Sequence, residues 1–147
     1  MSTVYKLAIP LRWGDMDAYG HVNNVTMVQI LEEARVALFG PPPSSGEPAL
    51  ERQVPLPLFA TLPAGTQALV AENRVKYRNP LAYRGVPVRV EMQISKVTAA
   101  SVAVTYELYD PVTETHCVSA STTLAFFNTQ TGSLVRLSPD QRQKLSQ

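Results

Sequence analysis

The spacing of apolar residues predicts one buried helix in the first third of the chain. Between Val25 and Phe39, apolar positions recur three and four residues apart, which is the period of an α-helix. Asn23 or Asn24 can cap its start, and Gly40, followed by three prolines, ends it. Glu32 and Arg35 are spaced to form an ion pair one turn apart. The wide apolar stripe indicates a mostly buried helix; it comprises Met27, Ile30, Leu31, Ala34, Ala37 and Leu38.

From Gln67 onward apolar and polar residues alternate, which is the period of a strand with one solvated face. This alternation predicts strands at 69–78, 86–95, 102–108 and 118–126 and a short edge strand at 134–137, and residues 4–11 also have strand composition. Hairpin-length connections at 98–101, 110–115 and 128–133 imply an antiparallel meander. Residues 138–141, Ser-Pro-Asp-Gln, predict the capped start of a short terminal helix.

The segment 40–65 is a long proline-rich connection, with a short turn of helix expected near 48–52. Helix and strands are segregated, which predicts an α+β fold in which one long central helix lies across a curved antiparallel sheet of five or six strands. A chain of 147 residues fits a single domain spanning 1–147.

Composition narrows the classes of partner. Charged residues make up only 17% of the chain, below the usual ~25%, so we expect part of the surface to be covered by another copy. The formal net charge of +1 gives no support for a nucleic-acid or anionic-membrane surface. A single cysteine, Cys117, excludes an internal disulfide and fits a reducing compartment. Because residues 1–10 lack a long apolar core and no segment has the length of a membrane span, we expect a cytoplasmic protein.

Polar groups are concentrated in the turn before the predicted helix, at residues 14–24. The unpaired N–H groups at a helix start favour negative charge, either on a side chain or on a developing oxyanion. An ionised carboxylate there can act as base or nucleophile, and the N–H of Asn24 or Val25 could polarise a carbonyl.

These residues resemble a known family. Residues 12–24, Arg-Trp-Gly-Asp-Met-Asp-Ala-Tyr-Gly-His-Val-Asn-Asn, and residues 31–35, Leu-Glu-Glu-Ala-Arg, are similar to the signature of the hotdog-fold acyl-CoA thioesterases of the 4-hydroxybenzoyl-CoA thioesterase-like group. Residues 75–81 resemble the family more weakly. The resemblance implies a hotdog fold, hydrolysis of an acyl-CoA to a free acid and coenzyme A without a cofactor, and a homodimer or dimer of dimers with active sites between subunits.

The resemblance also implies roles for individual residues. The second Asp of the motif is the catalytic carboxylate, here Asp17, which acts either as nucleophile or as general base. The amide near Asn24 polarises the thioester carbonyl, Asn23 can orient water or the carbonyl, and His21 orders the loop or contacts substrate. Further expected contacts with the substrate come from Tyr19, Gly20, Val25 and Arg78, with Arg78 a candidate for the coenzyme A phosphates. The acyl pocket is expected to be lined by Leu56, Leu58, Phe59 and Leu62.

Simpler interpretations compete at several positions. Asp15 is expected to be a turn residue, and no third carboxylate lies near Asp15 and Asp17 to make a metal site. His116 and Cys117 are adjacent on a predicted strand and should point to opposite faces, which argues against a catalytic dyad.

Two alternative functions remain open: a hotdog dehydratase or hydratase, for which His21 is the available base, and a non-catalytic acyl-CoA-binding module.

Overall fold

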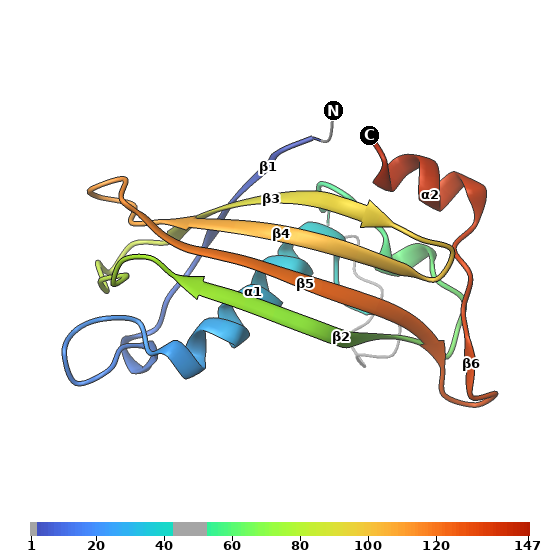
Figure 1. Ribbon diagram of the computed structural model, residues 1–147, viewed down its shortest axis with the longest axis horizontal. Helices are drawn as coiled ribbons and strands as arrows, with labels where there is room; N and C mark the ends of the chain where they lie inside the picture. The colour runs from blue at the N-terminus through green and yellow to red at the C-terminus, as the bar shows by residue number, and fades with distance from the viewer. Residues whose placement is uncertain (1–2, 43–52) are drawn as a thin grey trace.

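The protein folds into one antiparallel sheet with a helix on its inner face (Figure 1). The structure is a computed structural model and describes residues 3–42 and 53–147. The strands are β1 (Tyr5–Ile9), β2 (Thr66–Tyr77), β3 (Val88–Val97), β4 (Ser101–Tyr109), β5 (His116–Asn128) and β6 (Ser133–Leu134). The helices are α1 (Asn24–Phe39) and α2 (Pro139–Leu145), and two 3-10 turns lie at Trp13–Asp15 and Phe59–Thr61.

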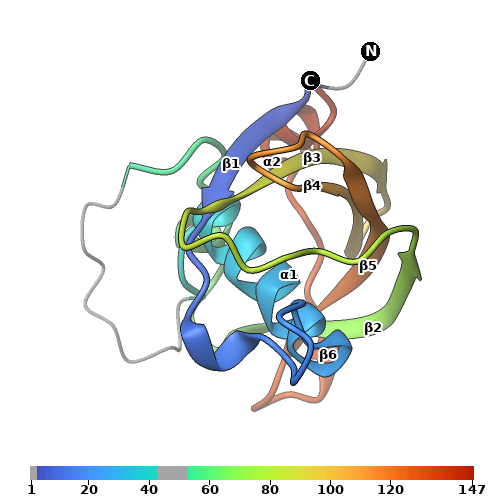
Figure 2. The ribbon, with the colours of Figure 1, turned by 90° about the vertical axis from the view of Figure 1, so that its left-hand side faces the viewer.

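The strand order is β1-β3-β4-β5-β2, with β6 paired to the end of β5. The predicted meander is confirmed, because β3, β4 and β5 pair in sequence. The chain's first strand and β2 occupy the two edges, and Figure 2 shows the sheet curling around α1. Periodicity alone did not specify these edge partners, since it shows which face a residue occupies but not which strand lies beside it.

Residues at the two ends of α1 determine where the helix begins and where it stops. Asn23 caps it, with its side-chain oxygen accepting from the N–H of Val25 at 2.9 Å. Gly40 ends it with a φ of 85°, a conformation that glycine adopts at little cost.

The prediction of one long central helix is wrong in its proportions. The helix has only 16 residues, which rise about 24 Å at 1.5 Å each. The 13 residues of β5 extend about 43 Å because a strand rises about 3.3 Å per residue. A short helix therefore crosses a much longer sheet.

The core lies between α1 and the inner faces of the strands. Side chains of β4 and β5 alternate as predicted, with Val102, Val104, Tyr106 and Leu108 buried on β4. The four leucine and phenylalanine side chains expected to line an acyl pocket, Leu56, Leu58, Phe59 and Leu62, are all buried in this same core. The helical turn expected near 48–52 lies outside the described residues.

Arg35 differs from its prediction. Its guanidinium turns into the core instead of pairing with Glu32, and donates to the hydroxyls of Tyr106 and Thr122 at 3.1 and 3.3 Å. Thr122 donates onward to Asn73 on β2 at 2.7 Å. This series of hydrogen bonds connects α1 to three strands, β4, β5 and β2. A surface pair was expected because Arg35 is charged and lies one turn from Glu32, and the spacing does not show that polar partners on the strands await it in the core.

The terminal helix α2 begins as predicted, with a reciprocal capping box between Ser138 and Gln141. Gln141 also donates to the carbonyl of Thr61 at 3.1 Å, which fixes α2 against the end of the proline-rich connection.

An ion pair clamps the turn between β4 and β5. The Asp110 carboxylate, 4% exposed, receives three bonds from two nitrogens of Arg84 and two from the N–H groups of Val112 and Thr113. Burial alone would raise the pKa of Asp110, but the bonds from Arg84 and from the two amides outweigh it and hold that pKa below its ordinary 3.8.

We expect Asp110→Asn to lower the free energy of unfolding by about 2 kcal/mol at pH 7, because it removes the charge that these four donors share. The pKa is depressed in the folded state, so the contribution is complete above pH ~4 and is lost as pH falls through the folded-state pKa. Urea unfolding at pH 7 and pH 3 measures this, with Asp140→Asn, an exposed partner of Lys144, as control. Equal stability of Asp110→Asn and wild type at pH 7 would contradict the assignment.

Candidate functional site

The polar turn predicted to carry the chemistry is a tight hairpin-like loop. Met16 and Val22 form a bridge, and the N–H of Asp17 donates to the carbonyl of His21 at 2.6 Å. Gly20 has a φ of +79°, which a residue with a side chain adopts only with strain. On its other side the loop pairs with residues 81–83: Val22 donates to Leu81, and Tyr83 donates to the carbonyl of Gly20. The loop is therefore fixed on both flanks.

Asp17 projects its carboxylate back over this loop. One oxygen, Oδ1, accepts from the N–H of Tyr19 at 2.7 Å and from that of His21 at 3.1 Å. The other oxygen, Oδ2, has no hydrogen-bond partner among the described residues. The side chain is half-buried, so the two amides orient the carboxylate and leave one oxygen open.

The start of α1 provides a free donor beside this loop. The side-chain oxygen of Asn23 accepts a hydrogen bond from the N–H of Val25. The N–H of Asn24, in contrast, has no acceptor within the described part of the chain. Of the two amides considered from the sequence, the structure therefore leaves that of Asn24 open. The N–H of Asn23 donates to the carbonyl of Asp15 at 2.8 Å, which joins the helix start to the loop.

Tyr77 is a site residue that sequence reasoning missed. Its hydroxyl donates to the carbonyl of Asn24 at 2.9 Å, from the end of β2. Burial raises the pKa of Tyr77 above its ordinary value of 10, so the phenol is protonated and able to donate at neutral pH. The alternation of β2 contained a signal, because Tyr77 has the same parity as Val75 and faces the helix side of the sheet.

Asp15 is the structural residue that was predicted. It is buried, and its carboxylate accepts from the backbone N–H of Arg12 at 2.7 Å and from the Arg12 guanidinium at 3.0 Å. Among the described residues no group of three His, Cys, Asp or Glu side chains is placed to hold a metal ion.

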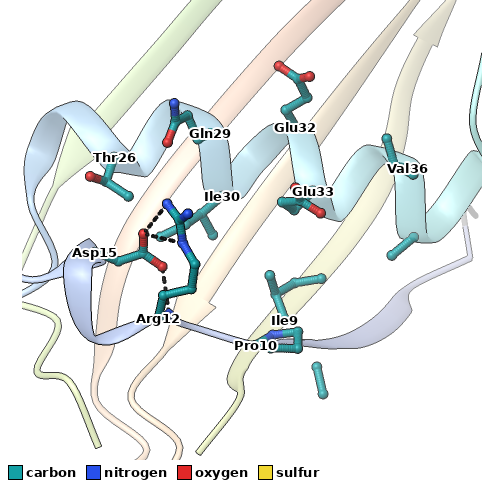
Figure 3. A pocket seen from close by; sticks show the side chains of 12 residues that line it. Ile9, Pro10, Arg12, Asp15, Thr26, Gln29, Ile30, Glu32, Glu33 and Val36 are labelled. Carbon is teal, nitrogen blue, oxygen red and sulfur yellow. Dashed lines mark hydrogen bonds and ion pairs between the residues drawn. The ribbon is translucent and has the colours of Figure 1, made fainter. Parts of the chain in front are cut away.

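Two hollows lie near these residues. The larger, of about 580 Å³, runs between β1 and α1, and Figure 3 shows the Arg12–Asp15 pair at one end with Glu32 and Glu33 further along the helix. Asp17 does not line it. A smaller cavity of about 220 Å³ lies at the helix start, lined by Val22, Met27, Tyr77, Arg78, Asn79, Pro80, Leu81 and Val118.

Comparison with known proteins decides the family. A family model described as the thioesterase-like superfamily matches residues 11–145. The chain belongs to this superfamily. Membership confirms the resemblance found at residues 12–24 and the predicted class of enzyme, a thioester hydrolase. A search of the curated proteins finds no match.

Solved structures share the hotdog fold of this thioesterase-like chain. A predicted thioesterase from Bacillus stearothermophilus superposes with a TM-score of 0.72 at 22% identity, covering 97% of this chain and 94% of its own. The 1,4-dihydroxy-2-naphthoyl-CoA thioesterase Slr0204 from Synechocystis gives 0.69 at 16% identity, with 99% and 95% covered. The DHNA-CoA thioesterase from Staphylococcus aureus gives 0.68 at 17%, with 97% and 87% covered. At these identities the likeness establishes the fold.

The structure also places the other residues that were predicted to contact the substrate. Tyr19 and Val25 flank the loop and helix start and are 84% and 77% exposed. Arg78 directly follows β2, and its Nε donates to Ser119 at 2.8 Å. His21 contributes its backbone to the loop, and its ring makes no hydrogen bond among the described residues.

Within the described ranges, 3–42 and 53–147, no helix has the length and apolarity to cross a membrane.

The pair His116 and Cys117 is separated as predicted. The thiol of Cys117 is buried against the carbonyls of Pro80 and Thr115, and burial raises its pKa, so it is a poor nucleophile. His116 lies on the outer face and contacts Glu107.

Proposed function

We propose that the protein hydrolyses acyl-CoA thioesters to a free carboxylic acid and coenzyme A, with Asp17 as the catalytic carboxylate and the N–H of Asn24 polarising the carbonyl. The observation that supports this most is the pairing of an oriented carboxylate with an open oxygen, Asp17 Oδ2, and an open helix-start amide on one rigid loop. Family membership supplies the reaction class, and the similarity to a 1,4-dihydroxy-2-naphthoyl-CoA thioesterase supports a coenzyme A thioester as the substrate type.

A thioester suits these groups because thiolate is a good leaving group, so hydrolysis needs a polarised carbonyl and a nucleophile. In one route Oδ2 of Asp17 attacks the carbonyl carbon, the C–S bond breaks, and water hydrolyses the resulting mixed anhydride. In the other, Oδ2 takes a proton from water, which attacks the same carbon; the C–S bond then breaks, and the departing thiolate takes up a proton. In both routes the negative charge that develops on the carbonyl oxygen falls at the N–H of Asn24.

The active unit in this proposal is a homodimer or a dimer of dimers. Strand β2 is an edge of 12 residues, and a long edge with exposed apolar side chains favours pairing with another chain. Such side chains lie on β2 and on the adjacent first turns of α1: Leu69, Val70, Tyr77, Val25 and Val28. A second copy at this edge would cover them and close the open side of the helix start.

A thiol-release assay on short-chain, long-chain and aromatic acyl-CoAs tests the function. We expect saturable release of free thiol from at least one class, with the acid and coenzyme A in equal amounts. Loss of an enoyl chromophore without thiol release would identify a hydratase, and saturable binding without either change would identify a binding module. Either of these results contradicts the proposal.

A further inference from the structure

A cluster of polar side chains outside the loop surrounds Arg78. We define it as the Arg78 cluster: Arg78, Glu107, His116 and Ser119. The Nε of Arg78 donates to Ser119 Oγ at 2.8 Å, and that hydroxyl donates to Glu107 Oε2 at 2.6 Å. His116 Nε2 contacts the same Oε2 at 2.5 Å. Glu107 and Ser119 are direct cross-strand partners on β4 and β5, so the register of the sheet brings them together.

The cluster contains the residue types of a serine hydrolase but not its geometry. In a catalytic triad the acid binds one ring nitrogen of His and the serine the other. Here Glu107 and Ser119 both lie on Nε2, at 2.5 and 3.3 Å, and the serine proton points to the carboxylate. Ser119 is therefore not an activated nucleophile, and the cluster has another role.

The arrangement holds Arg78 without neutralising it. Among the described residues Arg78 forms no salt bridge: the Glu107 carboxylate lies beyond the Ser119 hydroxyl, and its Oε2 accepts from Ser119 and contacts His116. Its two terminal nitrogens make no hydrogen bond there either. His116 is itself fixed by stacking on Tyr109, with ring centroids 5.0 Å apart. The cluster thus presents an oriented guanidinium fork with both ends open, the geometry that binds phosphate oxygens in pairs.

Arg78 also borders the candidate site. Arg78 lines the 220 Å³ cavity together with Tyr77, whose hydroxyl binds the carbonyl of Asn24. Three residues further along, Leu81 accepts from Val22 of the Asp17 loop. The N–H groups of Arg78 and Asn79 both donate to the carbonyl of Cys117, so the backbone at this point is fixed to β5.

We propose that Glu107, His116 and Ser119 are positioning residues that hold Arg78 to bind a phosphate group of the coenzyme A part of the substrate. This rests on the proposed function, in that it assumes a coenzyme A thioester. Lys76, which faces Ser119 across β2 and β5, adds positive charge at the same edge. Glu91, the cross-strand neighbour of Glu107 on β3, forms an ion pair with Arg89 at 3.6 Å.

The direct test is equilibrium binding, which needs no turnover. The dissociation constants of coenzyme A, dephospho-coenzyme A and pantetheine are measured by calorimetry for wild type and Arg78→Gln. We expect Arg78→Gln to weaken coenzyme A binding about tenfold and to leave pantetheine unchanged, since pantetheine has no phosphate. If the effect of Arg78→Gln persists with dephospho-coenzyme A, the contact is the pyrophosphate; if it disappears, the contact is the 3′-phosphate. Both results support the proposal. Arg74→Gln is the matched control, because Arg74 is an exposed arginine of β2, four residues before Arg78, that is paired with Glu72.

The role of Ser119 in positioning Arg78 is tested separately. Ser119→Ala should weaken coenzyme A binding about threefold, whereas Ser119→Thr keeps the hydroxyl and should bind coenzyme A like wild type. Ser121→Ala, two residues along the same face, is the control. With a hydrolysed acyl-CoA, Ser119→Ala should raise KM and leave kcat unchanged. The positioning role is wrong if Ser119→Ala binds coenzyme A like wild type, and the phosphate contact is wrong if Arg78→Gln does so or weakens pantetheine equally. Arg78-dependent binding without thiol release would overturn the hydrolase proposal alone.

Discussion

Replacing Asp17 by Asn is expected to lower kcat for thioester hydrolysis by about 10²- to 10⁴-fold, the range typical of a positioned base or nucleophile. The amide oxygen of Asn can still accept from Tyr19 and His21, so the loop should keep its shape. What is lost is the negative charge on the open oxygen, Oδ2. KM should change little, because the substitution alters the reacting group and leaves the surrounding surfaces in place.

The matched control for this variant is Asp140→Asn, a carboxylate on α2 that pairs with Lys144 far along the chain from the loop. Thiol release over a range of acyl-CoA concentrations gives kcat and KM for wild type and both variants. Thermal unfolding of each shows that the fold is unchanged. A folded Asp17→Asn protein with wild-type kcat would remove Asp17 from the mechanism.

Val70→Lys is expected to convert the proposed dimer to a monomer and to lower kcat/KM at least tenfold. Val70 lies on the edge strand β2 and is 46% exposed in the single chain, so the substitution costs the isolated fold little. At a paired β2 edge the substitution would put a positive charge into the contact surface of each copy, so both the lost apolar contact and the added charge would oppose association. Activity should fall with it because the open side of the helix start would lose its cover.

Val112→Lys serves as the control, since Val112 is an exposed valine in the β4–β5 turn, away from the edge. Light scattering coupled to gel filtration measures the mass of wild type and both variants over a range of concentrations. A wild type that is monomeric at every concentration, or a Val70→Lys protein that remains dimeric and fully active, would contradict the proposed assembly.

Local features of the fold could be predicted from the sequence because their causes are local. Asn23 and Gly40 delimit α1, and the Ser138–Gln141 capping box starts α2, each through bonds between residues that are near neighbours in the chain. The two-residue period identified the strands for the same reason, since alternation is a property of one strand. The short edge strand predicted at 134–137 lies at Ser133–Leu134.

Features that depend on register could not be predicted. Glu107 and Ser119 are twelve residues apart and meet only because β4 and β5 pair in one particular register. Tyr77 reaches the carbonyl of Asn24 across 53 residues, which requires β2 to lie at the edge beside β5. The same limit applied to Arg35, whose partners Tyr106 and Thr122 are on strands far along the chain.

Within the site, the motif identified the loop and the helix start, and the structure divides the roles more finely. Asp15 and Asp17 have the same chemistry in sequence, yet Asp15 is saturated by Arg12 whereas Asp17 keeps one oxygen open. Asn24 and Val25 were equivalent candidates for the polarising amide, and the Asn23 cap removes Val25. These distinctions depend on individual hydrogen bonds that no spacing pattern encodes.

The central claim is that Asp17 Oδ2 and the N–H of Asn24 meet at the thioester carbonyl. A crystal structure of the protein with an unreactive acyl-CoA analogue, in which a methylene separates carbonyl and sulfur, tests it most directly. We predict the carbonyl oxygen within about 3 Å of the Asn24 nitrogen and Oδ2 within about 3.5 Å of the carbonyl carbon or of a water that contacts it. An analogue bound with its carbonyl elsewhere, for example in the groove between β1 and α1, would contradict the account.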